Sequence, residues 1–75
     1  MIHTPKEAGL LLRSLRQQQG LTQTQLAEKA RVSPRWLINF EAGKTTVDMS
    51  LVMDCYQSLG YGMDIAPLPR RGDHG

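Results

Sequence analysis

Three side chains that could read DNA bases lie at helical spacing near the middle of the chain. Arg35, Ile38 and Asn39 are three and four residues apart, whereas the neighbouring Leu37 and Phe40 are the apolar residues expected to face inward. Arginine pairs with guanine, asparagine pairs with adenine, and an apolar side chain contacts the thymine methyl group. An exposed isoleucine is unremarkable by itself, but the three together predict a helix that enters a DNA major groove.

The helix that would carry these side chains has clear signals at both ends. Ser33 can cap its start, and Pro34 suits its first position because that position needs no N–H donor. Val32 and Leu37 have the spacing of a hydrophobic staple, which fixes the angle at which the chain enters the helix. Gly43 is expected to end the helix in the left-handed conformation.

A second short helix is expected just before this one. Thr22 can cap it, and Gln25 completes a capping box. Its narrow apolar face lets another helix approach closely and consists of Leu26, Ala27 and Ala30. Gln23 lies in the first turn, where free N–H groups and a side-chain amide suit a phosphate oxygen. A solvated glutamine is the alternative, and position alone barely separates the two.

Basic residues gather around these two helices. The segment from residue 29 to residue 44 holds one acid, Glu41, and four bases, Lys29, Arg31, Arg35 and Lys44. On charge alone, a solvated basic face is the simpler interpretation. Trp36 lies among them, and we expect it to pack against the preceding helix with its indole N–H close enough to reach a phosphate.

Two amphipathic segments flank the pair. In residues 5–19 the apolar positions fall on one helical face and are Ala8, Leu11, Leu12 and Leu15. In residues 49–59 they are Leu51, Val52, Cys55, Tyr56 and Leu59. Thr4 and Asp48 can cap these helices, and Gly20 and Gly60 can end them. Cys55 is expected to act as a small buried apolar residue and not as a nucleophile.

The end of the chain predicts a strand and a subunit contact. Tyr61, Met63 and Ile65 alternate with smaller or polar residues, so residues 61–66 are expected to form one strand. A single strand needs a partner, and pairing with its copy in a second subunit is the economical solution. The dimer interface is therefore expected to contain Met53, Tyr56, Tyr61, Met63 and Ile65. Residues 67–75 are expected to be disordered.

The totals bound the class of protein. Seventy-five residues allow one small domain, and a net charge of +2 does not by itself indicate nucleic acid. One cysteine allows no internal disulfide and no zinc cluster. We expect no signal peptide, no membrane span, no metal, no cofactor and no small-molecule ligand, and thus a cytoplasmic, nucleoid-associated protein. An enzyme is not expected, because His3 and His74 lie at the ends and no catalytic set can be placed.

The central stretch LTQTQLAEKARVSPRWLINFEAGK resembles the helix-turn-helix of the phage-repressor (XRE) family. The resemblance implies an all-α fold, a compact lambda-repressor-like domain of four to five helices. We expect that domain to span residues 5–60, after a flexible N-terminus at residues 1–4. A looser match, TTVDMSLVMDCYQSLGYGMDIAP, resembles the end of HipB-type antitoxin regulators. There a strand, here residues 61–66, pairs across a homodimer.

The resemblance also implies roles for individual residues. The groove-facing positions of the recognition helix are Ser33, Pro34, Arg35, Ile38 and Asn39. Positions near DNA phosphates are Thr22, Gln23, Arg31, Trp36 and Lys44. Arg16 and Glu41 match an ion pair that ties the first helix to the end of the third. Arg31 departs from the family pattern because glycine usually occupies that turn position, and a left-handed arginine costs about 1 kcal/mol.

HipB-type regulators repress their own operon and bind a HipA-type kinase toxin, so the implied partners are palindromic operator DNA, a second copy of the chain and such a kinase. Two alternatives stay open. One is a stand-alone regulator of the same fold without a toxin. The other is an interaction module that does not bind DNA.

Overall fold

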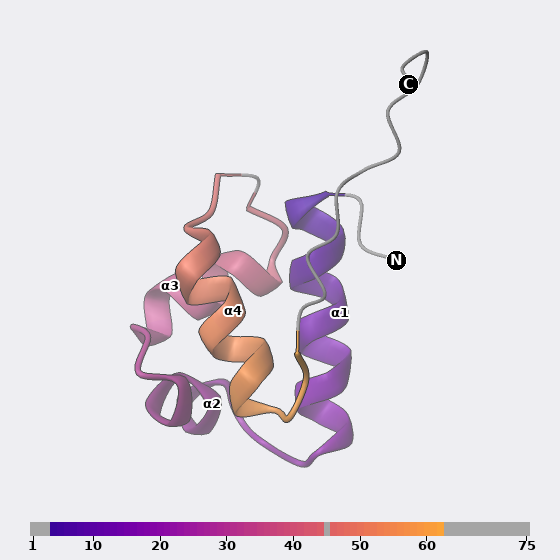
Figure 1. The fold of residues 1–75 in the computed structure, drawn as a ribbon, viewed down its shortest axis with the longest axis vertical. Coiled ribbons are helices and arrows are strands. Elements are labelled where there is room, and N and C mark those ends of the chain that lie inside the picture. The colour runs from indigo at the N-terminus through magenta and orange to yellow at the C-terminus, as the bar shows by residue number, and fades with distance from the viewer. Residues whose placement is uncertain (1–3, 45, 63–75) are drawn as a thin grey trace, which may run out of the picture.

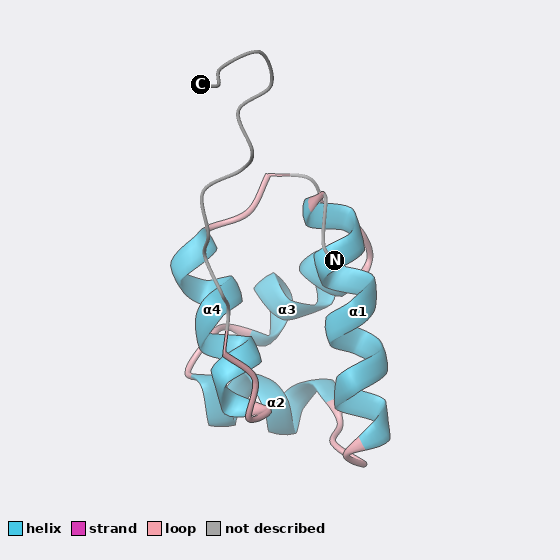
Figure 2. Ribbon diagram, turned by 45° about the vertical axis from the view of Figure 1, so that its right-hand side comes forward, coloured by secondary structure: helices cyan, strands magenta, loops and turns pink. Residues whose placement is uncertain are grey.

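The computed structural model describes residues 4–44 and 46–62, which form four helices (Figure 1). They are α1 (Pro5–Gln18), α2 (Gln23–Ala30), α3 (Pro34–Glu41) and α4 (Met49–Ser58). Helix α3 packs against α1 and α2, and α2 also packs against α4. The described residues contain no strand (Figure 2). The predicted all-α class is confirmed, and the helix ends agree with the sequence to within one residue for α1 and α4.

Capping side chains explain where the helices begin. The Thr4 hydroxyl accepts a hydrogen bond from a backbone N–H at the start of α1. At α2 the Thr22 hydroxyl accepts from the Gln25 N–H at 3.0 Å, and the Gln25 side chain accepts from the Thr22 N–H at 2.8 Å. Ser33 and Asp48 cap α3 and α4 in the same way. The predicted caps and capping box are therefore confirmed.

One core joins the four helices. Its largest fully buried side chains are Phe40, Leu12, Leu26, Leu37, Val52 and Cys55. The prediction for α1 was partly wrong, since Leu11 is 41% exposed whereas Gly9 and Arg16 are buried. Positions 9, 12 and 16 follow one stripe of the helix, and α3 packs on that stripe. An apolar pattern could not find this face, because glycine and arginine hold two of its positions.

Gly9 is where α1 and α3 come closest. A Cβ atom added at Gly9 would collide with the carbonyl oxygen of Phe40 and lie 2.9 Å from its carbonyl carbon. Both are backbone atoms, which cannot rotate away as a flexible side chain can. The absence of a side chain at residue 9 therefore sets the distance between α1 and α3.

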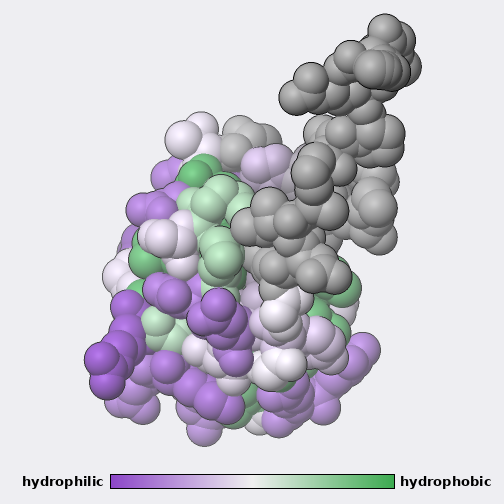
Figure 3. Space-filling model, viewed as in Figure 1, coloured by the Kyte–Doolittle hydropathy of each residue, from purple (hydrophilic) through white to green (hydrophobic). Residues whose placement is uncertain are grey.

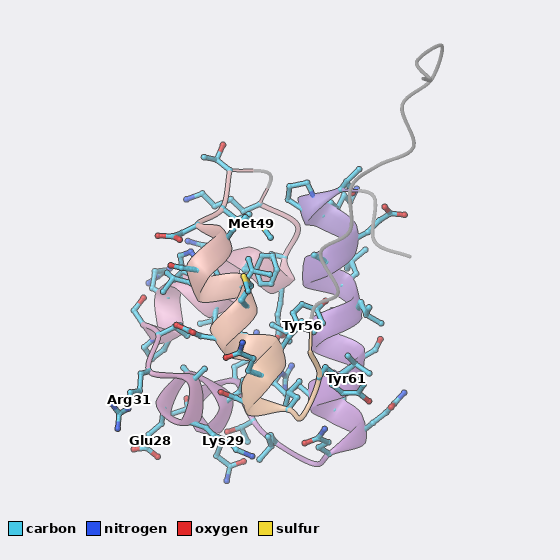
Figure 4. All side chains as sticks on the ribbon, viewed as in Figure 1. Glu28, Lys29, Arg31, Met49, Tyr56 and Tyr61 are labelled. Carbon is cyan, nitrogen blue, oxygen red and sulfur yellow. The ribbon has the colours of Figure 1, made fainter. Side chains whose placement is uncertain are left out.

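Tyr56 joins α4 to α1. Its hydroxyl donates a 2.6 Å hydrogen bond to the carbonyl oxygen of Ala8, and the residue is 3% exposed. Figure 4 shows its side chain between the two helices. The assignment of Tyr56 to a dimer interface is therefore corrected, because a residue committed to the core offers almost no surface to a second subunit.

The predicted strand lies largely outside the described residues. Of residues 61–66, the structure describes Tyr61, which is 43% exposed, and Gly62. Met63, Ile65 and the predicted tail at residues 67–75 fall outside. None of the described helices combines the length and apolar character needed to cross a lipid bilayer.

Candidate nucleic-acid interface

A tight turn sets the angle between α2 and α3. Arg31 adopts the left-handed conformation, with φ 61° and ψ 41°. The Val32 N–H bonds to the carbonyl oxygen of Ala27 at 3.0 Å, and the Arg31 N–H bonds to that of Glu28 at 3.3 Å. This is the Schellman pattern that usually employs glycine. The sequence predicted strain at Arg31, and the observed φ is in the region where a side chain costs about 1 kcal/mol.

The exposed side of α3 carries the predicted base-reading residues. Leu37 and Phe40 are fully buried, whereas Arg35 is exposed and Ile38 is 41% exposed. Asn39 is half-buried. Ser33 and Pro34 are exposed at the start of the helix, and the Ser33 hydroxyl accepts from a backbone N–H of the first turn. The turn and the buried pair thus present one side of α3 to solvent.

Trp36 is half-buried beside this surface. Its ring stacks on Phe40, with ring centroids 5.0 Å apart and an interplanar angle of 23°. The stacking partner lies one turn along the same helix, and Trp36 also packs against the core that the helices share. The expected contact with α2 stays a prediction. Within the described residues the indole N–H makes no hydrogen bond, so it can donate to a ligand.

Lys44 lies three residues beyond the last residue of α3. Gly43 has φ 101°, and the Lys44 N–H bonds to the carbonyl oxygen of Asn39 at 3.1 Å. The left-handed glycine turns the chain sharply, and the hydrogen bond holds the backbone of Lys44 against the end of α3. The exposed lysine therefore lies beside the C-terminal end of α3.

A buried polar network lies under the start of α2. The Arg16 guanidinium donates to both carboxylate oxygens of Glu41, at 2.8 and 2.9 Å, and to the carbonyl oxygen of Leu21 at 2.7 Å. Arg16 is 7% exposed and Glu41 is 2% exposed. The two residues implied as an ion pair therefore meet with the geometry of a bidentate contact.

Gln23 joins this network. Its side-chain Nε2 donates to the Oε1 atom of Glu41 at 3.1 Å. One amide hydrogen is thus committed to the protein, and the side chain is held beside the first turn of α2. Sequence reasoning missed this contact, because Gln23 and Glu41 are eighteen residues apart and only the fold brings them together.

The remaining predicted positions lie on two helices, at the two ends of α2 and on α4. Thr22 is exposed at the start of α2, and Arg31 extends from the opposite end of that helix, away from the body of the domain (Figure 4). Met53 is half-buried on α4. Figure 3 shows hydrophobic residues over the first half of α4, where Met49 is 52% exposed. Exposed apolar side chains therefore gather over the first half of α4.

The described residues offer no obvious centre for covalent or metal chemistry. Burial raises the pKa of the Cys55 thiol to about 12, with smaller contributions from the charges of Asp54 and Glu41. A thiol with that pKa is neutral and unreactive near neutral pH. No group of three or more metal-binding side chains occurs among the described residues.

Comparisons with known proteins agree with this geometry. A family model described as a helix-turn-helix domain matches residues 7–64. The uncharacterized HTH-type transcriptional regulator y4mF of Sinorhizobium fredii is 42% identical over 71 residues, which are 93% of this chain and 93% of that protein.

Solved structures of HipB are similar as well. The chain in the "HipB-O1-O2 complex" is 27% identical and superposes with a TM-score of 0.78 over 89% of this chain and 97% of that one. The chain in the "HipB-O4 20mer complex" gives 0.79 at the same identity, over 89% of this chain and 94% of that one. The fold is HipB-like, and the chain belongs to the helix-turn-helix family of DNA-binding transcriptional regulators.

Proposed function

We propose that this protein is a sequence-specific repressor that binds a palindromic operator as a homodimer and represses its own operon. The observation that carries the proposal is the exposed side of α3, where Arg35 and Ile38 are accessible while Leu37 and Phe40 are buried. A short, rigidly capped helix with this surface suits insertion into a major groove. The similarity to HipB complexes supports the same function.

Within this proposal, α3 reads bases and its surroundings hold the backbone. Arg35 forms a bidentate contact with guanine, worth about 1–3 kcal/mol of discrimination, and Ile38 contacts a thymine methyl group. Asn39 reads a neighbouring adenine, and Ser33 and Pro34 complete the contact at the start of the helix. The phosphate contacts come from Thr22, Gln23, Arg31, Trp36 and Lys44, and they give affinity that falls steeply with salt.

A homodimer would place two α3 helices in successive major grooves about 34 Å apart. The exposed apolar surface on α4, with Met49 and the half-buried Met53, supports a subunit contact there. Tyr61, which is 43% exposed, is the first residue of the proposed strand, which also contains Met63 and Ile65. Analytical ultracentrifugation at micromolar concentration measures the oligomeric state directly, and a monomer under those conditions would contradict the proposed dimer.

The proposed physiological role is that of a cytoplasmic antitoxin and autoregulator, whose second partner is a HipA-type kinase toxin. The support is the likeness to HipB over most of the chain. Co-expression with the neighbouring gene product and co-purification test this partner. Recovery of the repressor alone would contradict the proposed toxin partner and would leave the proposed regulation of DNA unaffected.

The recognition surface is tested by comparing two charge deletions. Arg35→Ala should relax base preference, because it removes a base contact, whereas Lys44→Ala should weaken binding to all sequences about equally. Fluorescence anisotropy with a set of single-base operator variants separates the two. An unchanged preference in Arg35→Ala would contradict the assignment of α3.

A further inference from the structure

A hollow of about 290 Å³ lies at the junction of α1, the start of α2 and α3. The residues that line it are Arg13, Arg16, Gln23, Ile38, Glu41 and Ala42. Its volume is at the lower end of the roughly 300–1,000 Å³ of ordinary ligand pockets. It borders the recognition surface, because Ile38 belongs both to the hollow and to the exposed side of α3.

The charges around the hollow favour an anion. Arg16 and Glu41 are both buried and compensate each other, with each carboxylate oxygen accepting a bond from the guanidinium. Arg13 is exposed, and it forms no ion pair with an acid among the described residues. The lining therefore carries one uncompensated positive charge, which belongs to Arg13.

A hydrogen-bonding amide lies in the same lining. The Gln23 amide nitrogen is anchored on Glu41 at 3.1 Å through one hydrogen, which leaves its second hydrogen free to donate. Gln23 is also the first residue of α2, whose N-terminal end attracts negative charge. An arginine from α1 and a fixed amide from α2 thus border one small space.

We propose that Arg13 of α1 is a further phosphate-contacting residue, and that it binds across this hollow to the same DNA phosphate as Gln23. The proposal rests on the DNA-binding function proposed above and adds a residue to it. Arginine suits the role because its planar guanidinium binds two phosphate oxygens at once. Since phosphate contacts fix the register of a protein on the duplex, this contact would set how deeply α3 enters the groove.

The test measures binding to a duplex that carries the site footprinted upstream of the gene, by anisotropy across a salt series. Arg13→Ala should bind about tenfold more weakly, because a hydrogen bond to a charged group is lost. The slope of log affinity against log salt should fall by about one unit. Arg13→Lys should recover part of the affinity, since it restores the charge but not the bidentate geometry.

Lys29→Ala is the matched control. It also removes one exposed positive charge, but Lys29 lies in a separate groove with Arg31 and residues of α4. Equal losses in Arg13→Ala and Lys29→Ala would overturn the proposed contact, because they would reflect net charge alone. Thermal unfolding of each variant by circular dichroism should match the unaltered protein, since both side chains are exposed.

Duplexes with one neutral methylphosphonate at each position in turn locate the contact. Neutralising one particular phosphate in each half-site should weaken binding by the unaltered protein. The same substitution should not weaken binding by Arg13→Ala any further, because that variant already lacks the contact. Sensitivity to the same phosphates in both proteins would overturn the proposed contact while leaving the DNA-binding function intact. Failure of the unaltered protein to bind any duplex at low salt would overturn both.

Discussion

Replacing Arg16 with methionine tests the buried network. The change removes three hydrogen bonds from the guanidinium and leaves the Glu41 carboxylate, 2% exposed, with the Gln23 amide as its remaining side-chain partner. Breaking a buried pair in this way costs about 3–5 kcal/mol. A domain of this size has a total free energy of unfolding of roughly 4–11 kcal/mol, so Arg16→Met should be only marginally folded.

Urea denaturation followed by circular dichroism, at one fixed protein concentration, measures this loss. The double variant Arg16→Met/Glu41→Leu serves as the control. It replaces the pair by apolar side chains, and it should recover most of the stability because no buried charge remains. A loss below about 1 kcal/mol in Arg16→Met would refute the reasoning, since that is typical of a solvent-screened surface pair.

Four further outcomes follow from the packing of the helices. Gly9→Ala should destabilise the protein by about 1–3 kcal/mol, because its Cβ meets the Phe40 backbone, and thermal unfolding measures the loss. Tyr56→Phe should cost about 1 kcal/mol in urea through the lost hydrogen bond to Ala8. Burial also raises the pKa of Tyr56 to about 12 from an ordinary 10.0, so the unaltered protein should lose stability as pH rises from 10 to 12, and the phenylalanine variant should lose less. Cys55, whose pKa is raised to about 12 by burial, should react with Ellman's reagent at pH 8 only after denaturant is added.

Each of these outcomes has a result that would contradict it. Ser14→Ala, on the exposed side of α1, isolates the gain in helix propensity from the clash at Gly9. If both alanine variants were more stable than the unaltered protein, the close approach of α1 and α3 would be wrong. If Tyr56→Phe and the unaltered protein were equally stable at every pH, the hydrogen bond from Tyr56 to Ala8 would be contradicted. Rapid labelling of Cys55 in native buffer would mean that the thiol lies at the surface.

Local signals predicted the helices well. Caps such as Thr22 and Ser33 act within three residues of their own position, so the sequence alone reveals them. The buried faces of α3 and α4 followed from apolar spacing for the same reason. The resemblance to the phage-repressor and HipB-type families was confirmed by the family model and by the HipB structures.

Features that depend on distant parts of the chain were not predictable from spacing. Gly9 is buried because the backbone at Phe40 needs its space, and no pattern within α1 reveals that. The bond from Gln23 to Glu41 likewise joins two helices. Tyr56 was assigned both to the core and to a subunit surface, and only its contact with Ala8 decided between them. No role was predicted for Arg13, because the residues that line the hollow with it come from α1, α2 and the end of α3.

The most direct test of the central claim is a DNase I footprint of the protein on the DNA upstream of its own gene, at about 50 mM salt where phosphate contacts are strong. The account predicts protection of a segment with two-fold symmetry, and loss of that protection in Arg35→Ala. Uniform cleavage with the unaltered protein at micromolar concentration would contradict an operator-binding repressor.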